Sequence, residues 1–137
     1  MKRVLEPGGH FVISEMHRDG QTEPQLTAVC IHHWAAEIDT ALGVRHNRTL
    51  ARQEFVDFVE SLGLCDLEFY DFVDIDSDPT DEATMKQVES YVDRFIQRVE
   101  ELSDYKALKQ RGEGLCRRLH DVGVQREPVL IVTGKKQ

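Results

Sequence analysis

A histidine and a carboxylate lie four residues apart close to the single tryptophan of the chain. His33 and Glu37 fall within a segment, residues 24–42, whose apolar residues recur at helical spacing. A helical wheel puts both on the same face as Cys30 and Trp34, and residues four apart on one face can pair. Such a pair could act as a general base, or it could bind a metal ion. It could equally be a structural pair satisfied by its own hydrogen bond. His33 and Glu37 are therefore the candidate catalytic residues.

A second group of polar residues follows an apolar run. Phe11, Val12 and Ile13 come directly after Pro-Gly-Gly, which is typical of a buried strand. In open α/β sheets ligands bind outside the carboxyl ends of the strands, so the residues after this run would face a substrate. The alternative is a solvated loop.

A small basic cluster precedes the next helical pattern. Arg45, His46 and Arg48 could hold an anionic group of a substrate, or they could neutralise neighbouring carboxylates. With the residues after the apolar run and the tryptophan, the predicted substrate-binding residues are Glu15, Met16, His17, Trp34, Arg45 and His46.

The sequence predicts no metal site. His32 and His33 are adjacent and point apart on a helix, and neither HxxxH nor HExxH occurs. The acidic segment 74–79 begins like a calcium loop, but Pro79 and Met85 stand where an EF-hand needs glycine and glutamate. We interpret this segment as a solvated linker in which Asp78 or Thr80 caps the following helix.

Composition narrows the classes of protein. The 137 residues are 40% hydrophobic and 31% charged, which fits one globular domain. The formal net charge of −8 argues against nucleic acid or an anionic membrane as partner, and no apolar run is long enough to cross a bilayer. Three widely spaced cysteines predict reduced thiols in a cytoplasmic protein.

The elements that would position these residues alternate between strands and helices. Gly112-Glu113-Gly114 predicts a break in the last helical pattern, and residues 2–6 predict the end of a further helix. The resulting order is typical of an α/β layered fold. We predict strands at 10–16, 66–73 and 129–132, and helices at 24–42, at 50–62 with Thr49 as N-cap, at about 81–102 and at about 104–121.

Three segments together resemble a known family. RVLEPGGHFVISEM (3–16), TLARQEFVDFVESLGL (49–64) and PVLIVTGKK (128–136) resemble, in order, the C-terminal half of class I S-adenosylmethionine-dependent methyltransferases that act on small molecules. The resemblance implies strands five, six and seven of a Rossmann-like fold with about four helices. Residues 1–137 would form one partial domain, with 74–127 a helical insertion between the last two strands. It also implies methyl transfer to a small-molecule acceptor, with S-adenosylmethionine as donor.

The cofactor-binding signature of that family lies upstream of the segments matched here. The family uses a glycine-rich turn after its first strand and an acidic residue after its second. The only GxG of this chain, at 112–114, follows no strand. Cofactor-binding residues are therefore unassigned, and we expect the chain alone to be inactive. The alternative function is a non-catalytic dimerisation or partner-binding module of the same ancestry.

The resemblance also leaves a sheet edge open. In the family, strand five lies between strands four and seven, so residues 10–16 here would expose one unpaired edge. Because such an edge pairs readily with another strand, we expect a homo-oligomer, through this edge or through helices exchanged across a two-fold axis.

Overall fold

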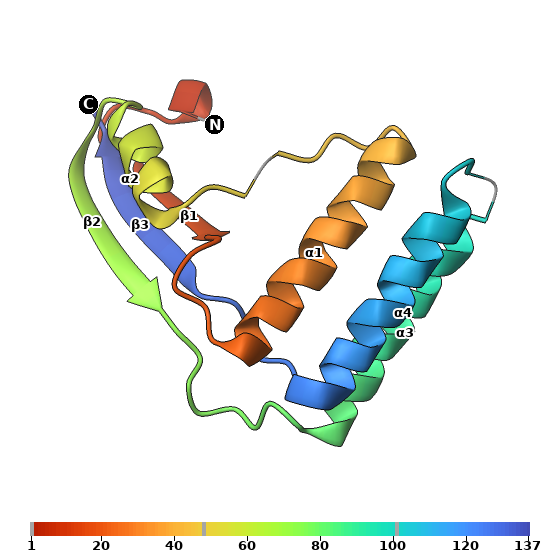
Figure 1. Cartoon of the computed structure of the whole chain (residues 1–137). Coiled ribbons are helices and arrows are strands. Elements are labelled where there is room, and N and C mark those ends of the chain that lie inside the picture. Colours follow the sequence, from red (N-terminus) through yellow and green to blue (C-terminus); the bar gives the residue numbers. More distant parts are fainter. Residues whose placement is uncertain (1, 48, 101) are drawn as a thin grey trace. The chain divides into compact units, whose positions relative to one another are not determined.

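The computed structural model describes residues 2–47, 49–100 and 102–137 (Figure 1). Its contacts divide the chain into two compact units. The first consists of residues 1–20, 49–74 and 127–137, and the second of residues 21–48 and 75–126. The elements are η1 (Lys2–Val4, a 3-10 turn), β1 (His10–Met16), α1 (Glu23–Ala41), α2 (Arg52–Glu60), β2 (Leu64–Phe72), α3 (Glu82–Arg98), α4 (Tyr105–Val122) and β3 (Val129–Lys136).

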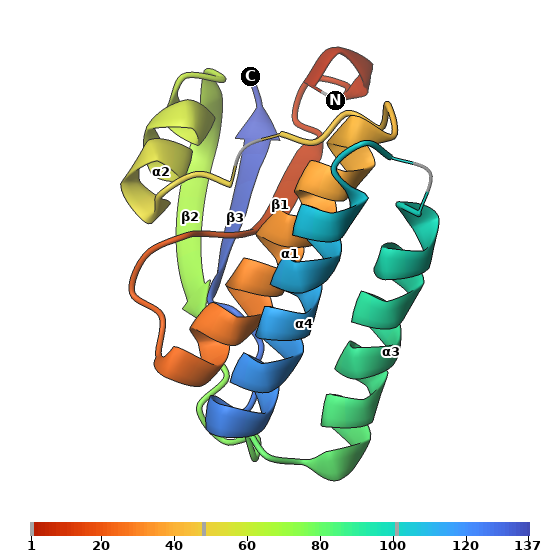
Figure 2. The ribbon, with the colours of Figure 1, turned by 45° about the vertical axis from the view of Figure 1, so that its right-hand side comes forward.

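The first unit is a three-stranded sheet with one helix. The strand order is β1-β3-β2, so the last strand in the sequence lies in the middle and runs antiparallel to both neighbours (Figure 2). β1 lies beside β3 in a continuous register from His10↔Lys135 to Met16↔Val129. The molecule is therefore a small α/β chain with an open antiparallel sheet. The adjacency of segment 10–16 and the closing strand is the one that the resemblance implies.

One face of the sheet packs against α2. Phe55 and Val59 of the helix are buried with Leu130 and Val132 of β3, and Ile13 of β1 packs at the margin of this cluster. Alternate residues of a strand face the same side, so residues 11 and 13 share the α2 side while Val12 points away and is 63% exposed. The run Phe11–Ile13, predicted as a buried strand, is therefore buried only on the face that α2 covers.

The beginning of α2 differs from the prediction. The helix starts at Arg52 with Ala51 as N-cap, not with Thr49, and the cap bond is formed by Glu54, whose carboxylate accepts the Ala51 N–H at 2.8 Å. A glutamate at the third helical position can thus satisfy the first free N–H even where the cap residue has no polar side chain.

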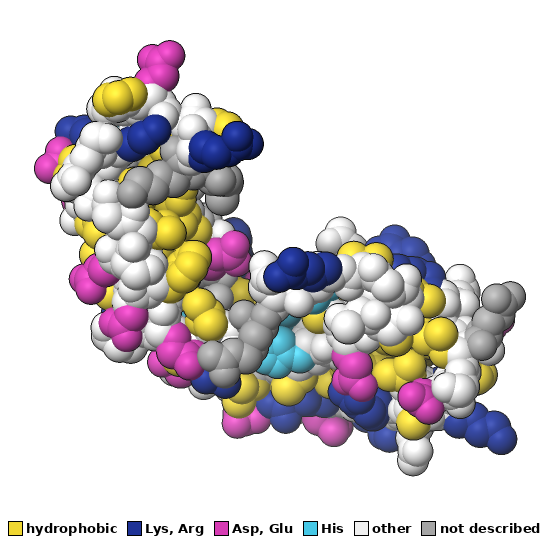
Figure 3. All heavy atoms as spheres, turned by 90° about the horizontal axis from the view of Figure 1, so that it is seen from above, with side chains coloured by type: hydrophobic (Ala, Val, Ile, Leu, Met, Phe, Trp, Pro, Cys, Tyr) yellow, Lys and Arg dark blue, Asp and Glu magenta, His cyan; other side chains and the backbone are white. Residues whose placement is uncertain are grey.

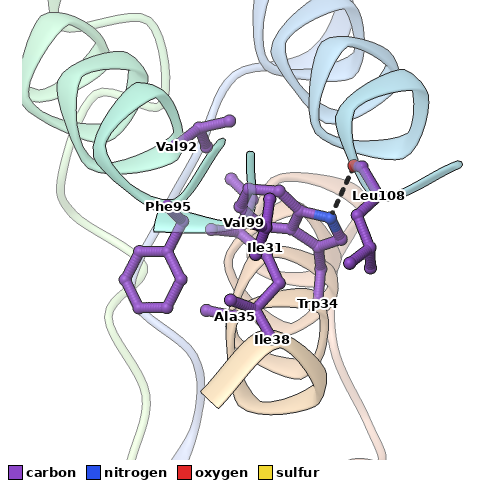
Figure 4. Packing of buried hydrophobic residues seen from close by; sticks show 8 residues of the cluster. All are labelled: Ile31, Trp34, Ala35, Ile38, Val92, Phe95, Val99 and Leu108. Carbon is purple, nitrogen blue, oxygen red and sulfur yellow. Dashed lines mark hydrogen bonds between the residues drawn. The ribbon is translucent and has the colours of Figure 1, made fainter. Parts of the chain in front are cut away.

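The second unit is built from α1, α3 and α4. Its core has Trp34 at the centre, and the indole N–H donates to the carbonyl oxygen of Leu108 at 3.0 Å (Figure 4). Thr22 caps α1, with its side chain accepting from the Gln25 N–H. Asp81, rather than Asp78 or Thr80, caps α3, because its carboxylate accepts from the Thr84 N–H at 2.8 Å. The buried members of the core are Ile31, Trp34, Ala35, Ile38, Val92, Phe95, Val99 and Leu108.

The predicted break at Gly112-Glu113-Gly114 is wrong. α4 continues from Tyr105 to Val122 without interruption. Gly112 is instead a packing position, since a Cβ there would lie 2.8 Å from Cζ2 of Trp34 and 3.1 Å from Cδ1 of Ile96. Similarly, residues 2–4 form a 3-10 turn where the sequence predicted the end of a helix.

The predicted helical insertion, 74–127, corresponds in part to the second unit, which also contains α1. Among the described residues, no helix is both long and apolar enough to span a membrane. The single-domain prediction stays a prediction.

Candidate functional site

The carboxyl ends of β1 and β2 lie together in the first unit. Met16 and Phe72 both stand opposite Val129, the first residue of β3. Arg52, the first residue of α2, donates hydrogen bonds to Asp19, which follows β1, and to Asp71, near the end of β2. Three elements thus bring polar side chains to one place, and we call this group the strand-end cluster: His17, Arg18, Asp19, Arg52, Glu54 and Asp71.

His17 is a buried imidazole held by a carboxylate. His17 is only 6% exposed, and its ring Nδ1 lies 3.2 Å from Oδ1 of Asp19. Its backbone N–H donates to the carbonyl oxygen of Pro128. The same Asp19 oxygen accepts the backbone N–H of Arg52 at 2.8 Å. The ring orientation is therefore coupled to the N-terminus of α2, where a carboxylate is also favoured by the helix dipole.

Arg52 and Asp71 form a two-point ion pair. Nε and Nη2 of the guanidinium each donate to one carboxylate oxygen at 2.6 Å. These hydrogen bonds hold the pKa of Asp71 below its usual range, with smaller charge contributions from Arg52 and His17, and raise the pKa of Arg52. Charge-assisted, planar pairing of this kind fixes both side chains. The first turn of α2 is thereby attached to the end of β2.

Arg18 attaches the segment after β1 to α2 a second time. Its guanidinium donates to Glu54 at 3.0 Å, and its backbone N–H donates to the carbonyl oxygen of Leu50 at 3.1 Å. Residues 17–19 are thus held through both main chain and side chains. This preorganisation is what positions a group for binding or proton transfer.

The strand-end cluster can bind a polar molecule and move a proton. An imidazole supported by a carboxylate is suited to accept a proton near neutral pH, and the neighbouring guanidinium groups can orient an anionic substituent. The described residues contain no group of three or more His, Cys, Asp or Glu side chains arranged to hold a metal ion.

The predicted substrate residues after β1 divide by burial. His17 belongs to the strand-end cluster, Met16 is half-buried at the end of β1, and Glu15 is exposed.

His33 and Glu37 lie on the exposed side of α1. Glu37 forms an ion pair with Arg111 of α4 at 2.7 Å, and His33 lies beside His32 with ring centroids 6.0 Å apart. The helical-wheel prediction that both share an apolar face is wrong, because Cys30 on that face is itself exposed. The buried side chains in this part of α1 are instead those of Ile31, Trp34, Ala35 and Ile38. The catalytic role of His33 and Glu37 stays a prediction.

Trp34 lies in the core of the second unit. It is 1% exposed and its only polar atom donates to Leu108. Burial of so large a ring is what core packing favours. The predicted role of Trp34 in substrate binding stays a prediction.

The predicted basic cluster is also in the second unit. His46 pairs with Asp39 at 3.1 Å, and Asp39 also accepts from Arg98 at 2.6 Å. These contacts fit the second interpretation of the cluster, in which basic residues neutralise neighbouring carboxylates. Arg45 is exposed, and Arg48 lies outside the described residues. Histidine side chains are visible at the surface in the space-filling view (Figure 3).

Sequence reasoning missed most of the strand-end cluster. Asp19, Arg52 and Asp71 stand 33 and 19 residues apart along the chain, so no local spacing indicates that they meet. Only the position of Asp19 close after a strand could have suggested a polar site.

Comparisons with known proteins give little beyond this geometry. No protein-family model and no curated protein matches the chain. Among solved structures, it is similar to Haemonchus contortus phosphoethanolamine N-methyltransferase 2 in complex with phosphomonomethylethanolamine and S-adenosylhomocysteine. The match has 12% identity and a TM-score of 0.36, and covers 98% of this chain. This chain spans about 28% of that protein's length, and a likeness so weak carries no argument.

Proposed function

We propose that this chain is the acceptor-side half of a class I S-adenosylmethionine-dependent methyltransferase that acts on a small molecule. The observation that carries the proposal is the position of β1 directly beside β3, because the resembled family places its fifth and seventh strands side by side. The three segments that carry the resemblance include β1, α2 and β3, which are packed in one unit.

In this proposal the strand-end cluster receives the acceptor. Ligands of open α/β folds bind beyond the carboxyl ends of strands, and β1 and β2 both end there. When an amine or hydroxyl is methylated it loses a proton, and His17, oriented by Asp19, is placed to accept one. Positioning of the acceptor by Arg18 and Arg52 supplies a further part of the acceleration.

The residues present do not make up a cofactor site. S-adenosylmethionine supplies the methyl group in the family, but the glycine-rich turn that receives it has no counterpart in these 137 residues. We therefore assign no cofactor-binding residue and derive no step through the cofactor. The chain alone is expected to bind an acceptor without methylating it.

Amide chemical-shift mapping by NMR tests the proposal. We would titrate the ¹⁵N-labelled chain with a library of small amines, phenols and carboxylates, and separately with S-adenosylhomocysteine. Acceptor-like compounds should shift amides in segments 16–20, 50–54 and 71–73. Shifts confined to the α1, α3 and α4 unit, or none anywhere at millimolar concentrations across the library, would contradict the proposal.

Three histidine variants, one of them a control, distinguish the two candidate bases His17 and His33. His17→Asn should abolish the shifts caused by an acceptor-like compound, whereas His46→Asn, an exposed histidine of the second unit, should leave them unchanged. His33→Asn tests the sequence-based prediction that His33 is catalytic. If the shifts are lost in this variant alone, the acceptor binds at α1.

The second candidate function is a non-catalytic dimerisation module of the same ancestry. The open edge of β1 favours it, since no described strand pairs with that edge. In that case the chain should self-associate and bind neither acceptor-like compounds nor S-adenosylhomocysteine.

A further inference from the structure

The two edges of the sheet in the first unit differ in their protection against further pairing. β2 has an irregular register between Cys65 and Glu68, and Asp66 within that stretch has φ 51°. Exposed acidic side chains at Asp66, Glu68 and Asp71 line the same strand. Bulges and charges of this kind are what natural sheets use to prevent edge-to-edge association.

β1 has no irregularity of this kind and a single acidic side chain, Glu15. Its seven residues, HFVISEM, contain neither lysine nor proline, and its register with β3 has no shift. Val12, next to the central residue Ile13, is 63% exposed. A straight edge with an apolar exposed residue is suited to receive another strand.

The hydrogen bonds to β3 identify which groups of β1 are turned outward. The N–H of Lys136 donates to the carbonyl oxygen of Gly9, and the N–H of His17 donates to Pro128. In an antiparallel ladder the N–H and C=O of one residue point to the same side and alternate along the strand. Odd-numbered residues from 9 to 17 therefore face β3, and the outward backbone groups belong to His10, Val12, Ser14 and Met16.

We propose that a second copy of this chain pairs with β1 across a two-fold axis, antiparallel, with Ile13 opposite Ile13 of the partner. This register places Val12 opposite Ser14 and His10 opposite Met16, so all outward N–H and C=O groups of β1 are paired. Ile13 meets its counterpart at a position without direct hydrogen bonds, where side chains are closest. This pairing does not require the proposed methyl transfer.

Neighbouring registers are excluded by bonds already made. A shift that centres on Val12 would set Met16 opposite Gly8, whose N–H donates to Lys136. A shift that centres on Ser14 would set His10 opposite Arg18, whose N–H donates to Leu50. A register shifted by one residue would place an even-numbered residue of one copy opposite an odd-numbered residue of the other. The α2-covered faces of the two sheets would then lie on opposite sides, which a two-fold axis perpendicular to the sheet does not allow.

Charge also permits self-pairing in the Ile13-centred register. Glu15 is the only acidic residue of β1, and it stands opposite Phe11 of the partner rather than its own counterpart. Like charges are thus kept apart at directly facing positions. Because the contact is limited to one strand per copy, we expect a weak dimer with a Kd of about 1–100 μM.

Sedimentation equilibrium between about 1 and 500 μM tests the proposal. The mass should rise with concentration from 15.8 kDa towards twice that value. Val12→Pro removes one outward N–H and no bond to β3, so it should weaken dimerisation by at least about tenfold. Val12→Thr keeps both the N–H and the β-branched shape, and should dimerise like the parent chain. A constant mass of 15.8 kDa up to 500 μM, or equal dimerisation of the two variants, would overturn the proposal.

A direct measurement of the register covers the case in which Val12→Pro does not fold. In a mixture of ¹³C-labelled and unlabelled chains, filtered NOEs should connect the Ile13 methyl groups of the two copies. NOEs between copies that arise only from α1, α3 and α4 would instead assign the dimer to exchanged helices. Because neither measurement involves an acceptor or S-adenosylhomocysteine, their failure is distinct from failure of the proposed function.

Discussion

Gly112 of α4 lies so close to Trp34 of α1 that a methyl group on its Cα would be 2.8 Å from Cζ2 of the indole. Two helices far apart in the sequence therefore approach each other at a point that only glycine accommodates. The neighbouring Leu108 carbonyl accepts the indole N–H, which fixes the ring at this point.

Gly112→Ala should destabilise the second unit. The added methyl group would displace Trp34 or Ile96, and overpacking of this kind costs about 1–3 kcal/mol, more than the gain of about 1 kcal/mol in helix propensity. Urea unfolding followed by the fluorescence of Trp34, the only tryptophan, measures the change. Gly114→Ala is the control, because its nearest neighbour would be 3.6 Å away, and it should stabilise the helix by up to about 1 kcal/mol.

The Arg52–Asp71 pair should make the first unit sensitive to acid. The pKa of Asp71 is lowered in the folded chain, so its stabilising contribution is present above the unfolded value of about 3.9 and is lost as the pH falls through the folded pKa. Both side chains are partly exposed, 37% and 45%, so we expect a coupling energy below about 1 kcal/mol. A double-mutant cycle with Arg52→Met and Asp71→Asn measures it at pH 7 and at pH 3.

In the same experiment, NMR titration of the Asp71 carboxyl should show its pKa rising in the Arg52→Met variant. An unchanged titration curve would mean that the guanidinium does not hold the carboxylate in solution.

Asp19→Ala should loosen the N-terminus of α2. It removes the acceptor for the Arg52 N–H and for the His17 ring, and loss of a cap-like bond costs about 1 kcal/mol. Faster hydrogen exchange of the Arg52 amide is the direct readout. Glu60→Ala, an exposed change at the other end of α2, should leave that exchange rate unaffected.

The cysteines should differ in reactivity. Burial raises the pKa of the Cys116 thiol, and the nearby carboxylates of Asp93 and Glu89 raise it further, so little thiolate forms at pH 8. Cys30 is exposed on α1. Brief treatment with a disulfide reagent, followed by peptide mass spectrometry, should modify Cys30 at least about ten times faster than Cys116. Equal rates would show that α4 opens on the labelling timescale.

Local patterns predicted the elements better than their contacts. The strands and the four helices were predicted because apolar spacing and glycine boundaries are local signals. The continuity of α4 was not, since propensity counts glycine against a helix and cannot register that Gly112 meets Trp34. Glu37 pairs with Arg111, 74 residues away, and a wheel drawn for one helix omits such partners.

The candidate site shows the same division. His17 was predicted from its place directly after a strand. Asp19, Arg52 and Asp71 were not, because their association depends on β1 and β2 ending at the same residue of β3.

The central place of β3 has a consequence for how the chain is made on the ribosome. Among the described strands, β1 and β2 each pair with β3 and not with each other, and β3 is translated after both of them. Until residues 129–136 have left the exit tunnel, neither of the two earlier strands can pair with β3, and the edge that each will turn to it stays open. We therefore expect the nascent polypeptide to depend on chaperones late in translation, and a ribosome stalled shortly before residue 129 to carry an unformed sheet.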